Sequence, residues 1–354
     1  MYRLPHQQEV KLMIQYHSFP LQMNELIDWQ GEPGFLIAPF PINGGEQSFL
    51  LQPDVICTPD EAMELIGKAL SDCHLFENTP MPVNDNRSTL KVEYMQQVSL
   101  AVAKIKEGYL NKVIISKCRV MAKPNGFHAE SLFNDLCNEY QHALVYYWQL
   151  PGVGSWMGAT PEPLMREQQG RIYTVSLAGT QTIGDRAPED VCWKEKEIAE
   201  QAIVSRFIVQ LLDKNGIEEM EITGPHNFRA GNLVHLNTGF EFDASQLHIS
   251  RGAFMSELHP TPSVAGLPRD ASLQLISNLE THNRSYFSGL LGPLELNGES
   301  HVYVNLRCMQ LFDDEFVLYS GAGITGNSNP ANEWEETDNK MKTLLNVIHV
   351  QTGH

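Results

Sequence analysis

The C-terminal stretch from residue 316 to residue 350 constrains the fold most, because it combines a strand, a glycine cluster and a helix. The apolar run at residues 316–319 predicts a strand, and the three glycines of residues 320–326 predict a turn after it. Pro330 and the acidic residues behind it are typical of a helix start, and apolar residues then recur at helical spacing. The stretch therefore predicts a strand that passes through a glycine-rich turn into a long helix.

The glycines of this turn also match a nucleotide-binding pattern. Gly321, Gly323 and Gly326 have the spacing of the dinucleotide fingerprint. That fingerprint opens a βαβ unit and needs further parallel strands behind it. No such unit follows residue 326 in this sequence, so we reject a Rossmann site. A glycine turn is still expected to present backbone N–H groups to an anion.

The first turn of the C-terminal helix carries two carboxylates on one face. Glu333 and Glu336 are three residues apart and therefore neighbours on the helix surface. One interpretation is a solvated helix start that complements the helix dipole, with Glu336 paired to Lys340. The other interpretation is a metal site, which requires a second carboxylate pair elsewhere in the chain.

A second carboxylate pair is present in the helix predicted over residues 189–213. Glu197 and Glu200 have the same three-residue spacing. Four converging carboxylates suit a hard divalent cation such as Mg²⁺, which keeps water ligands that a substrate can replace. The lack of paired histidines or cysteines argues against zinc. The two pairs together point to a magnesium site.

Four isolated residues have positions that suggest chemistry. Lys112 heads the strand predicted over residues 112–117; most such lysines face solvent, but in a half-buried cleft its pKa would fall and it would serve as a general base. Glu162 lies between two prolines and is either a polar turn residue or a fixed proton donor. His259 precedes a Pro-Thr-Pro loop, where most histidines are structural. Arg307 ends an apolar strand and needs an anionic partner if buried.

The remaining pattern is one of short strands and amphipathic helices. No internal repeat or low-complexity run is present in the 354 residues. Residues 79–90 are polar and contain prolines, so they are the best linker in the sequence. Further strands are predicted at residues 34–40, 47–51, 144–148, 172–180, 233–238 and 302–307, and helices at 60–70 and 92–105.

The charge and cysteine content restrict the partners of the chain. A net charge of −18 argues against nucleic acid and anionic membrane surfaces, so an anionic substrate would need local cations. The N-terminus has no apolar signal core, and no apolar run approaches the roughly 18 residues of a membrane span. Six dispersed cysteines without a CxxC pair indicate a reduced, cytoplasmic chain with buried thiols.

Nine separated motifs resemble, in order, those of the chorismate-utilising enzymes. That family includes isochorismate synthase, salicylate synthase and the large subunits of anthranilate and aminodeoxychorismate synthases. The motifs cover residues 91–354, and residues 1–90 match loosely. They are Lys112-Val-Ile-Ile-Ser, Gly158-Ala-Thr-Pro-Glu162, Ser176-Leu-Ala-Gly-Thr180, Glu197-x-x-Glu200, Leu258-His-Pro-Thr-Pro262, Tyr286-x-Ser-Gly289, Leu306-Arg307, Gly321-Ala-Gly323 and Glu333-x-x-Glu336-Thr.

The resemblance implies a fold and a set of ligands. The fold is a single α+β chorismate-binding domain over residues 1–354, with two large antiparallel sheets packed on each other, helices outside and the site in a cleft. Glu200 and Glu336 would bind Mg²⁺, with Glu197 and Glu333 assisting through water. The metal would hold the ring carboxylate of chorismate. The groups that would help to bind chorismate are the N–H groups near Gly321 and Gly323, the side chain of Thr180, and Arg307 and Tyr286 at the enolpyruvyl carboxylate.

The resemblance also implies the chemistry. Lys112 would deprotonate a water that attacks ring C2, and Glu162 would protonate the departing C4 hydroxyl. His259 would orient the substrate or its ring hydroxyl. Ala178 stands where aminodeoxychorismate enzymes typically have a nucleophilic lysine, and alanine leaves room for water. Two departures from the family pattern are Gln201, in place of a frequent histidine, and Lys117, in place of an arginine.

Isochorismate synthase is therefore the first functional hypothesis, feeding menaquinone or siderophore biosynthesis. Salicylate synthase, which adds elimination of pyruvate, is the alternative within the family. A catalytically inactive relative that binds a carboxylate ligand is the alternative of another class. Ala178 and His259 disfavour a glutamine amidotransferase subunit, and a monomer is expected.

Overall fold

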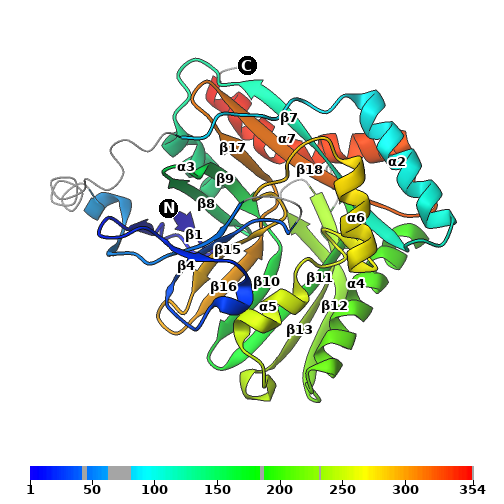
Figure 1. Ribbon diagram of the computed structural model, residues 1–354, viewed down its shortest axis with the longest axis horizontal. Coiled ribbons are helices and arrows are strands. Elements are labelled where there is room, and N and C mark those ends of the chain that lie inside the picture. Colours follow the sequence, from blue (N-terminus) through cyan, green and yellow to red (C-terminus); the bar gives the residue numbers. More distant parts are fainter. Residues whose placement is uncertain (42–45, 63–80, 184–186, 231–232, 353–354) are drawn as a thin grey trace.

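The fold consists of two large antiparallel sheets with helices on their outer faces (Figure 1). We describe it in a computed structural model, in which residues 1–41, 46–62, 81–183, 187–230 and 233–352 are placed. One sheet has seven strands and the other has nine, and every pair of neighbouring strands in them is antiparallel. This arrangement confirms the predicted α+β class with two packed sheets.

The seven-stranded sheet joins strands from both ends of the chain. Its central strands come from the middle and the C-terminal part of the sequence, and its first strand is the N-terminus. The order is β1 (Tyr2–Arg3), β8 (Leu144–Leu150), β9 (Gly154–Thr160), β17 (Cys308–Leu311), β18 (Glu315–Ile324), β7 (Lys112–Ala122) and β14 (Gly266–Leu267).

The nine-stranded sheet forms the other layer. Its order is β12 (Met220–Ala230), β13 (Leu233–Asp243), β11 (Arg171–Thr182), β10 (Pro163–Gln168), β16 (Ser300–Val304), β15 (Leu290–Leu294), β4 (Gly34–Ala38), β5 (Ser48–Leu51) and β3 (Leu21–Met23). A small separate sheet pairs β2 (Leu12–Ile14) with β6 (Val55–Cys57).

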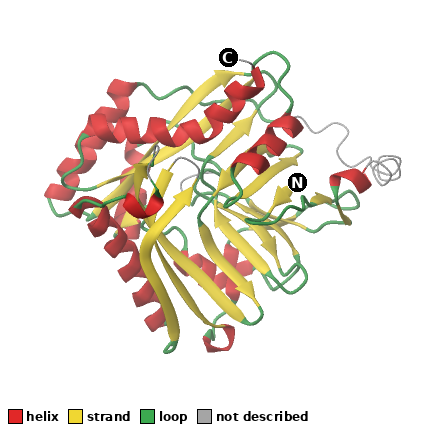
Figure 2. Ribbon diagram, turned by 180° about the vertical axis from the view of Figure 1, so that it is seen from behind, coloured by secondary structure: helices red, strands yellow, loops and turns green. Residues whose placement is uncertain are grey.

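The helices cover the sheets from outside (Figure 2). Contacts place α3 and α7 together against the seven-stranded sheet and α2 against α7, while α4 lies on β11 and β13. None of the helices in the described ranges is both long and apolar enough to cross a membrane. The helices are α2 (Lys91–Lys106), α3 (Ala129–Glu139), α4 (Glu195–Lys214), α5 (Arg251–Leu258), α6 (Arg269–Leu279) and α7 (Pro330–Thr352), with short 3₁₀ turns at Leu26–Asp28, Pro188–Asp190 and Ala244–Gln246.

An aromatic core fills the space between the two sheets. Trp148 and Trp156 of the seven-stranded sheet contact each other and the ring of Tyr286, which lies just before β15. Phe35 of β4 and Tyr303 of β16 belong to the same buried cluster. Burial of large aromatic side chains removes much apolar surface from water, and this core therefore holds the two layers together.

The expected glycine-rich turn is instead a strand, which is the main correction to the sequence analysis. Residues 320–324 continue β18 and pair with β7 as far as Ile324. A Cβ at Gly323 would lie 3.0 Å from both the Glu200 Oε1 and the Lys112 Cε atoms. Glycine is therefore used here for close approach of side chains to the backbone.

Smaller differences concern element ends. The helix predicted from residue 189 begins at Glu195, and the strand predicted to reach Arg307 stops at Val304. Residues 81–90 do not form a free linker: the Thr89 N–H donates to the Cys118 carbonyl at 3.0 Å, which ties this segment to β7. Of the helix predicted at 60–70, residues 63–70 lie outside the described residues.

The cysteines placed by the structure are all free thiols. Cys57, Cys118 and Cys308 are buried, as expected. Cys192, however, is exposed, because it lies in the irregular segment before α4.

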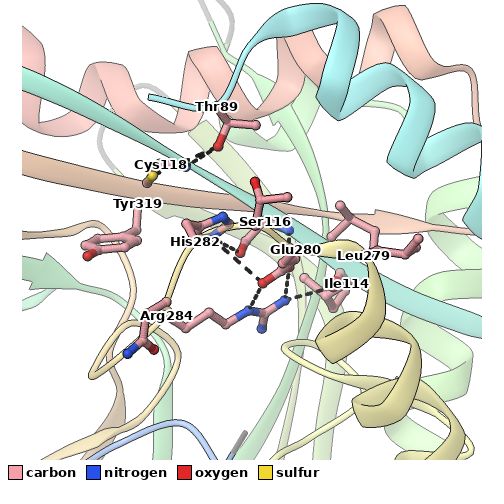
Figure 3. Close-up of polar contacts among 12 residues, drawn as sticks. Thr89, Ile114, Ser116, Cys118, Leu279, Glu280, His282, Arg284 and Tyr319 are labelled. Atoms are coloured by element: carbon pink, nitrogen blue, oxygen red, sulfur yellow. Dashed lines mark hydrogen bonds and ion pairs between the residues drawn. The ribbon is translucent and has the colours of Figure 1, made fainter. Parts of the chain in front are cut away.

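A buried ion pair braces the outer edge of β7 (Figure 3). The carboxylate of Glu280 accepts hydrogen bonds from the Arg284 guanidinium at 2.6 Å and from the Ser116 N–H at 2.6 Å. Arg284 also donates to the carbonyls of Ile114 and Val264. Among the described strands only the short β14 pairs with this edge, so these side chains satisfy the backbone groups that a further strand would bind.

Loss of this brace is expected to be costly. Arg284→Met leaves the Glu280 carboxylate buried without its counter-ion, which should lower the free energy of unfolding by about 3–5 kcal/mol. Chemical denaturation measures this. Arg87→Met is the matched control: Arg87 is 61% exposed in its pair with Glu93, and its loss should cost less than about 1 kcal/mol. Equal losses in the two variants would contradict a bracing role for Arg284.

Candidate active site

One cavity collects most of the residues that the motifs singled out. It is lined from β7, β11, β18, α4 and α7 and from the turns that follow β9 and β16. Segments more than 200 residues apart in the sequence therefore meet in one place. The predicted site residues in its wall are Lys112, Glu162, Ala178, Thr180, Glu200, Arg307, Gly321, Gly323 and Glu336.

Lys112 is held as a buried amine at the start of β7. Its side chain is 2% exposed, and its backbone is fixed by pairing with Leu267 and by the Ser272 hydroxyl, which donates to the Lys112 carbonyl at 3.1 Å. Burial lowers the pKa of Lys112 below its ordinary value, although the nearby carboxylate of Glu200 opposes the shift. The residue thus lies in the kind of environment that makes a lysine a usable base.

Glu162 is the opposite case, a buried carboxyl group that retains its proton. It is 5% exposed in the turn between β9 and β10, and its carbonyl accepts from the Val304 N–H, which fixes that turn. Burial raises the pKa of Glu162 to about 7, even though the charges of Arg307 and Lys112 act in the other direction. Near neutral pH this group is able to donate a proton.

Three carboxylates and two lysines form a charged cluster, of which Glu200, Glu336 and Lys340 line the cavity and the Glu333–Lys196 pair lies beside it. Glu336 pairs with Lys340 at 2.7 Å, and Glu333 pairs with Lys196 at 2.6 Å. The i, i+4 pair that the sequence suggested within α7 is therefore formed. Burial raises the pKa of Glu200, with a smaller contribution from the charge of Glu336, so these carboxylates act on one another.

The cluster fits a hard divalent cation by its unpaired oxygens. In the described ranges no three metal-ligating side chains already surround a common point. However, Glu200 Oε1 and Glu333 Oε2 are buried and accept no hydrogen bond within the part of the chain that is placed. Leaving such oxygens unpaired is unfavourable, and carboxylate oxygen is the ligand type that Mg²⁺ prefers. The donor set is therefore compatible with magnesium.

The fourth predicted carboxylate has a local structural contact. Glu197 does not line the cavity; its carboxylate accepts from the Lys194 N–H at 2.9 Å at the first turn of α4. This is the reciprocal half of a helix-capping arrangement. Its predicted role as a water-mediated metal ligand stays a prediction.

Positive charge and backbone donors gather at the cavity wall. Arg307 follows β16 with a left-handed backbone (φ of 50°), and burial lowers the pKa of its guanidinium, while Glu162 and Glu336 act in the other direction. It makes no ion pair with any residue in the described ranges, so its guanidinium is available to an anion. A buried arginine in this state is suited to binding a carboxylate.

The N–H groups of the two glycines face the unpaired edge of β18. The Ser116 N–H donates to Glu280 and the Gly321 carbonyl accepts from Lys340 at 2.9 Å, so these two opposed residues do not bond to each other. Hydrogen-bonded and non-bonded pairs alternate along an antiparallel ladder. The Gly321 and Gly323 N–H groups therefore point away from β7, and both residues line the cavity.

A histidine that the sequence analysis did not select lies in the cavity wall. His235 of β13 has its Nδ1 3.0 Å from the Gly179 carbonyl, which assigns the proton to Nδ1, and its buried Nε2 has no partner in the described chain. Burial lowers the pKa of His235 to about 3, with the charge of Arg307 in support. The neutral ring thus offers an acceptor to a ligand hydroxyl. In the sequence, the only sign of this role is that His235 falls at one of the alternate positions of a predicted strand that face inward.

Two predicted residues lie elsewhere. His259 lines a separate cavity beside Phe40, and both of its ring nitrogens lack partners within the described ranges. Tyr286 packs in the aromatic core and donates its hydroxyl to the Gln47 carbonyl at 3.0 Å. The structure therefore does not bring either side chain to the cavity that holds Lys112.

The two departures from the family pattern anchor the carboxylate-bearing helices. Gln201 points away from the cavity and donates to Ser176 and Thr238 of the nine-stranded sheet. Lys117 contacts the Trp334 ring, with its ammonium 3.2 Å from the ring centroid, and pairs with Asp338 at 2.5 Å. The first contact fixes α4 and the second fixes the start of α7.

The buried carboxyl group makes stability depend on pH. Glu162 has a folded-state pKa of about 7 against an ordinary value of 4.5, so its stabilising contribution is complete below pH 4.5 and is lost as the pH rises through 7. Glu162→Gln should therefore unfold like the wild type at pH 4.5, and at pH 8 be more stable by on the order of 2–3 kcal/mol. Denaturant unfolding at the two pH values tests this. The exposed Glu335→Gln is the control, and a Glu162→Gln variant without pH-dependent gain would contradict the buried, protonated state.

Comparisons with known proteins agree with this geometry. A model of the chorismate binding enzymes matches residues 28–349. The isochorismate synthase EntC of Escherichia coli K12 is 29% identical over 265 residues, which are 72% of this chain and 66% of that protein. A salicylate biosynthesis isochorismate synthase of Pseudomonas aeruginosa is 30% identical over 271 residues, 74% of this chain and 56% of that protein.

The matched region thus spans two thirds or less of the length of these two relatives. Among solved structures, DhbC from Bacillus anthracis has the same fold, with a TM-score of 0.79 at 21% identity over 98% of this chain and 95% of that one. The match of a family model to nine tenths of the sequence shows that the chain belongs to the chorismate-binding enzyme family, and residues from most of its motifs line one cavity.

Proposed function

We propose that the chain is an isochorismate synthase, which removes the C4 hydroxyl of chorismate and adds a hydroxyl from water at C2. The observation that carries the proposal is the pairing in one cavity of a buried amine of lowered pKa, Lys112, with a buried carboxyl group that is still protonated near pH 7, Glu162. Displacement of a hydroxyl by water needs one base and one acid, poised in these two states. The isochorismate synthases among the relatives support the choice of reaction.

The reaction balances with these two residues alone. Neutral Lys112 takes a proton from a water whose oxygen bonds to C2. The ring double bonds shift away from C2, and the C4–oxygen bond breaks. Glu162 gives its proton to the departing hydroxyl, which leaves as water. The product has the same atomic composition as the substrate. After the reaction Lys112 carries a proton and Glu162 has lost one, and proton exchange with solvent restores both residues.

The remaining wall residues suit the binding of a dianion. Arg307 and the Gly321 and Gly323 N–H groups supply donors for the two carboxylates. Ala178 leaves the space beside the ring open to water. His235 lines this cavity and His259 lines a separate one, so we assign to His235 the role of acceptor for a ring hydroxyl.

Magnesium is part of the proposal. Glu200 and Glu336 would be its ligands, with Glu333 and Glu197 assisting. When bound, the cation would hold the ring carboxylate and stabilise negative charge that develops on it. The proposal also includes the pathway that the product enters, which is menaquinone or siderophore biosynthesis. It further includes action as a monomer, without an amidotransferase subunit.

Product identification tests the reaction class. The pure protein is incubated with chorismate and Mg²⁺, with an EDTA control. The products are separated by chromatography and identified by mass spectrometry. We expect a species of unchanged mass and new retention that reaches equilibrium with chorismate and is absent with EDTA. Salicylate with pyruvate would assign the chain to salicylate synthase, and complete lack of turnover would favour an inactive ligand-binding relative.

A second prediction concerns the base and the acid separately. Turnover requires neutral Lys112, so it falls as the pH drops below that residue's lowered pKa, and requires protonated Glu162, so it falls as the pH rises through about 7. Lys112→Met and Glu162→Gln should each lower kcat by about 10²–10⁴-fold while circular dichroism shows an unchanged fold. Full activity of Lys112→Met would refute the assignment of the base. Lys123→Met, in the loop that follows the same strand, is the control.

A further inference from the structure

The ammonium group of Lys196 lies inside the carboxylate cluster. It bonds to Glu333 Oε1 at 2.6 Å, across from α4 to α7. Glu333 is 1% exposed, whereas the Lys196 side chain is 31% exposed. The pair therefore joins a carboxylate that cannot reach water to a cation that still can.

Three carboxylates act on this one ammonium. Burial opposes the charge of Lys196, but Glu333, Glu200 and Glu336 outweigh it and raise its pKa. These are the side chains that would ligate a divalent cation. Glu200 and Glu333 each keep one buried oxygen without a partner beside it. The single ammonium of Lys196 thus neutralises part of the negative charge of these carboxylates but leaves two of their buried oxygens without a hydrogen bond from the described residues.

The second lysine of the cluster is placed differently. Lys340 is 13% exposed, pairs with Glu336 and donates to the Gly321 carbonyl, so it is fixed on both sides within the cavity wall. Lys196 bonds to no other group in the described chain than Glu333. Release of Lys196 to solvent breaks one contact, and release of Lys340 breaks two.

We propose that Lys196 is an internal counter-ion that occupies the carboxylate cluster in the absence of metal and is displaced into solvent when a divalent cation binds. This rests on the cation site of the proposed function. The exchange replaces one positive charge by two, so it adds one positive charge to the cavity. That gain favours an anionic substrate after, rather than before, the cation.

Thermal unfolding with and without the cation tests the exchange. Lys196→Met removes the counter-ion, and Lys194→Met, an exposed lysine two residues away, is the matched control. In EDTA, we expect Lys196→Met to have a lower Tm than the wild type, because Glu333 is left buried and unpaired. In saturating Mg²⁺ the two Tm values should coincide, since Lys196 no longer contacts Glu333 in that state.

Calorimetric titration with Mg²⁺ gives the second readout. The affinity of Lys196→Met should be higher than that of the wild type by about tenfold, because the cation no longer competes with the ammonium. Lys194→Met should match the wild type in both experiments. Neither readout depends on turnover.

The outcomes separate this proposal from the cation site itself. Equal lowering of Tm in EDTA and in Mg²⁺ would mean that Lys196 stays on Glu333 in the loaded state, and would overturn the exchange alone. A wild type whose Tm and heat of titration do not respond to Mg²⁺ would overturn the cation site and the exchange together.

Discussion

Removal of charged groups from water is the constraint on which this structure depends. The cavity wall holds three carboxyl groups, two lysines and a guanidinium, and the Glu333–Lys196 pair adjoins it; a low-dielectric surrounding makes each of these charges costly alone. The costs are offset in pairs, as in Glu336 with Lys340 and Glu333 with Lys196. Lys112 and Glu162 have no ion-pair partner among the residues that the structure places, and their protonation shifts toward the neutral forms that acid–base chemistry needs.

The same constraint explains how a protein of net charge −18 can accommodate a dianion. Despite the net charge of the whole chain, Arg307, Lys340 and the backbone donors of β18 are gathered at the wall of one cavity. Local fields in a low-dielectric cavity exceed the screened field of distant surface charges. The Glu280–Arg284 pair serves the scaffold rather than the ligand, by holding the edge of β7 from which Lys112 projects.

The parts of this picture that were predictable from the sequence are local ones. Strand patterns such as residues 112–117, the carboxylate spacing in α4 and α7, and the order of the motifs all depend on near neighbours in the chain. The glycine segment was misassigned because its glycines serve the approach of Lys112 and Glu200, a contact between distant segments. His235 was not selected from the sequence for the same reason: the pairing of β13 with β11, which brings its ring to the cavity, joins distant segments of the chain. Which lysine neutralises Glu333 was likewise beyond sequence patterns, because Lys196 lies on another helix.

The pairing of β7 with β18 has a consequence for how the chain folds during its synthesis. β18 lies between β17 and β7 in the centre of its sheet, yet it is the last strand of the chain. During synthesis, β7 leaves the ribosome long before its partner exists, and the N–H and C=O groups along this edge stay unpaired until residue 324 has emerged. Contacts of such high sequence separation form slowly, and open strand edges recruit other chains. Products truncated before β18 would leave this edge of β7 unpaired, and we expect such products to aggregate rather than fold.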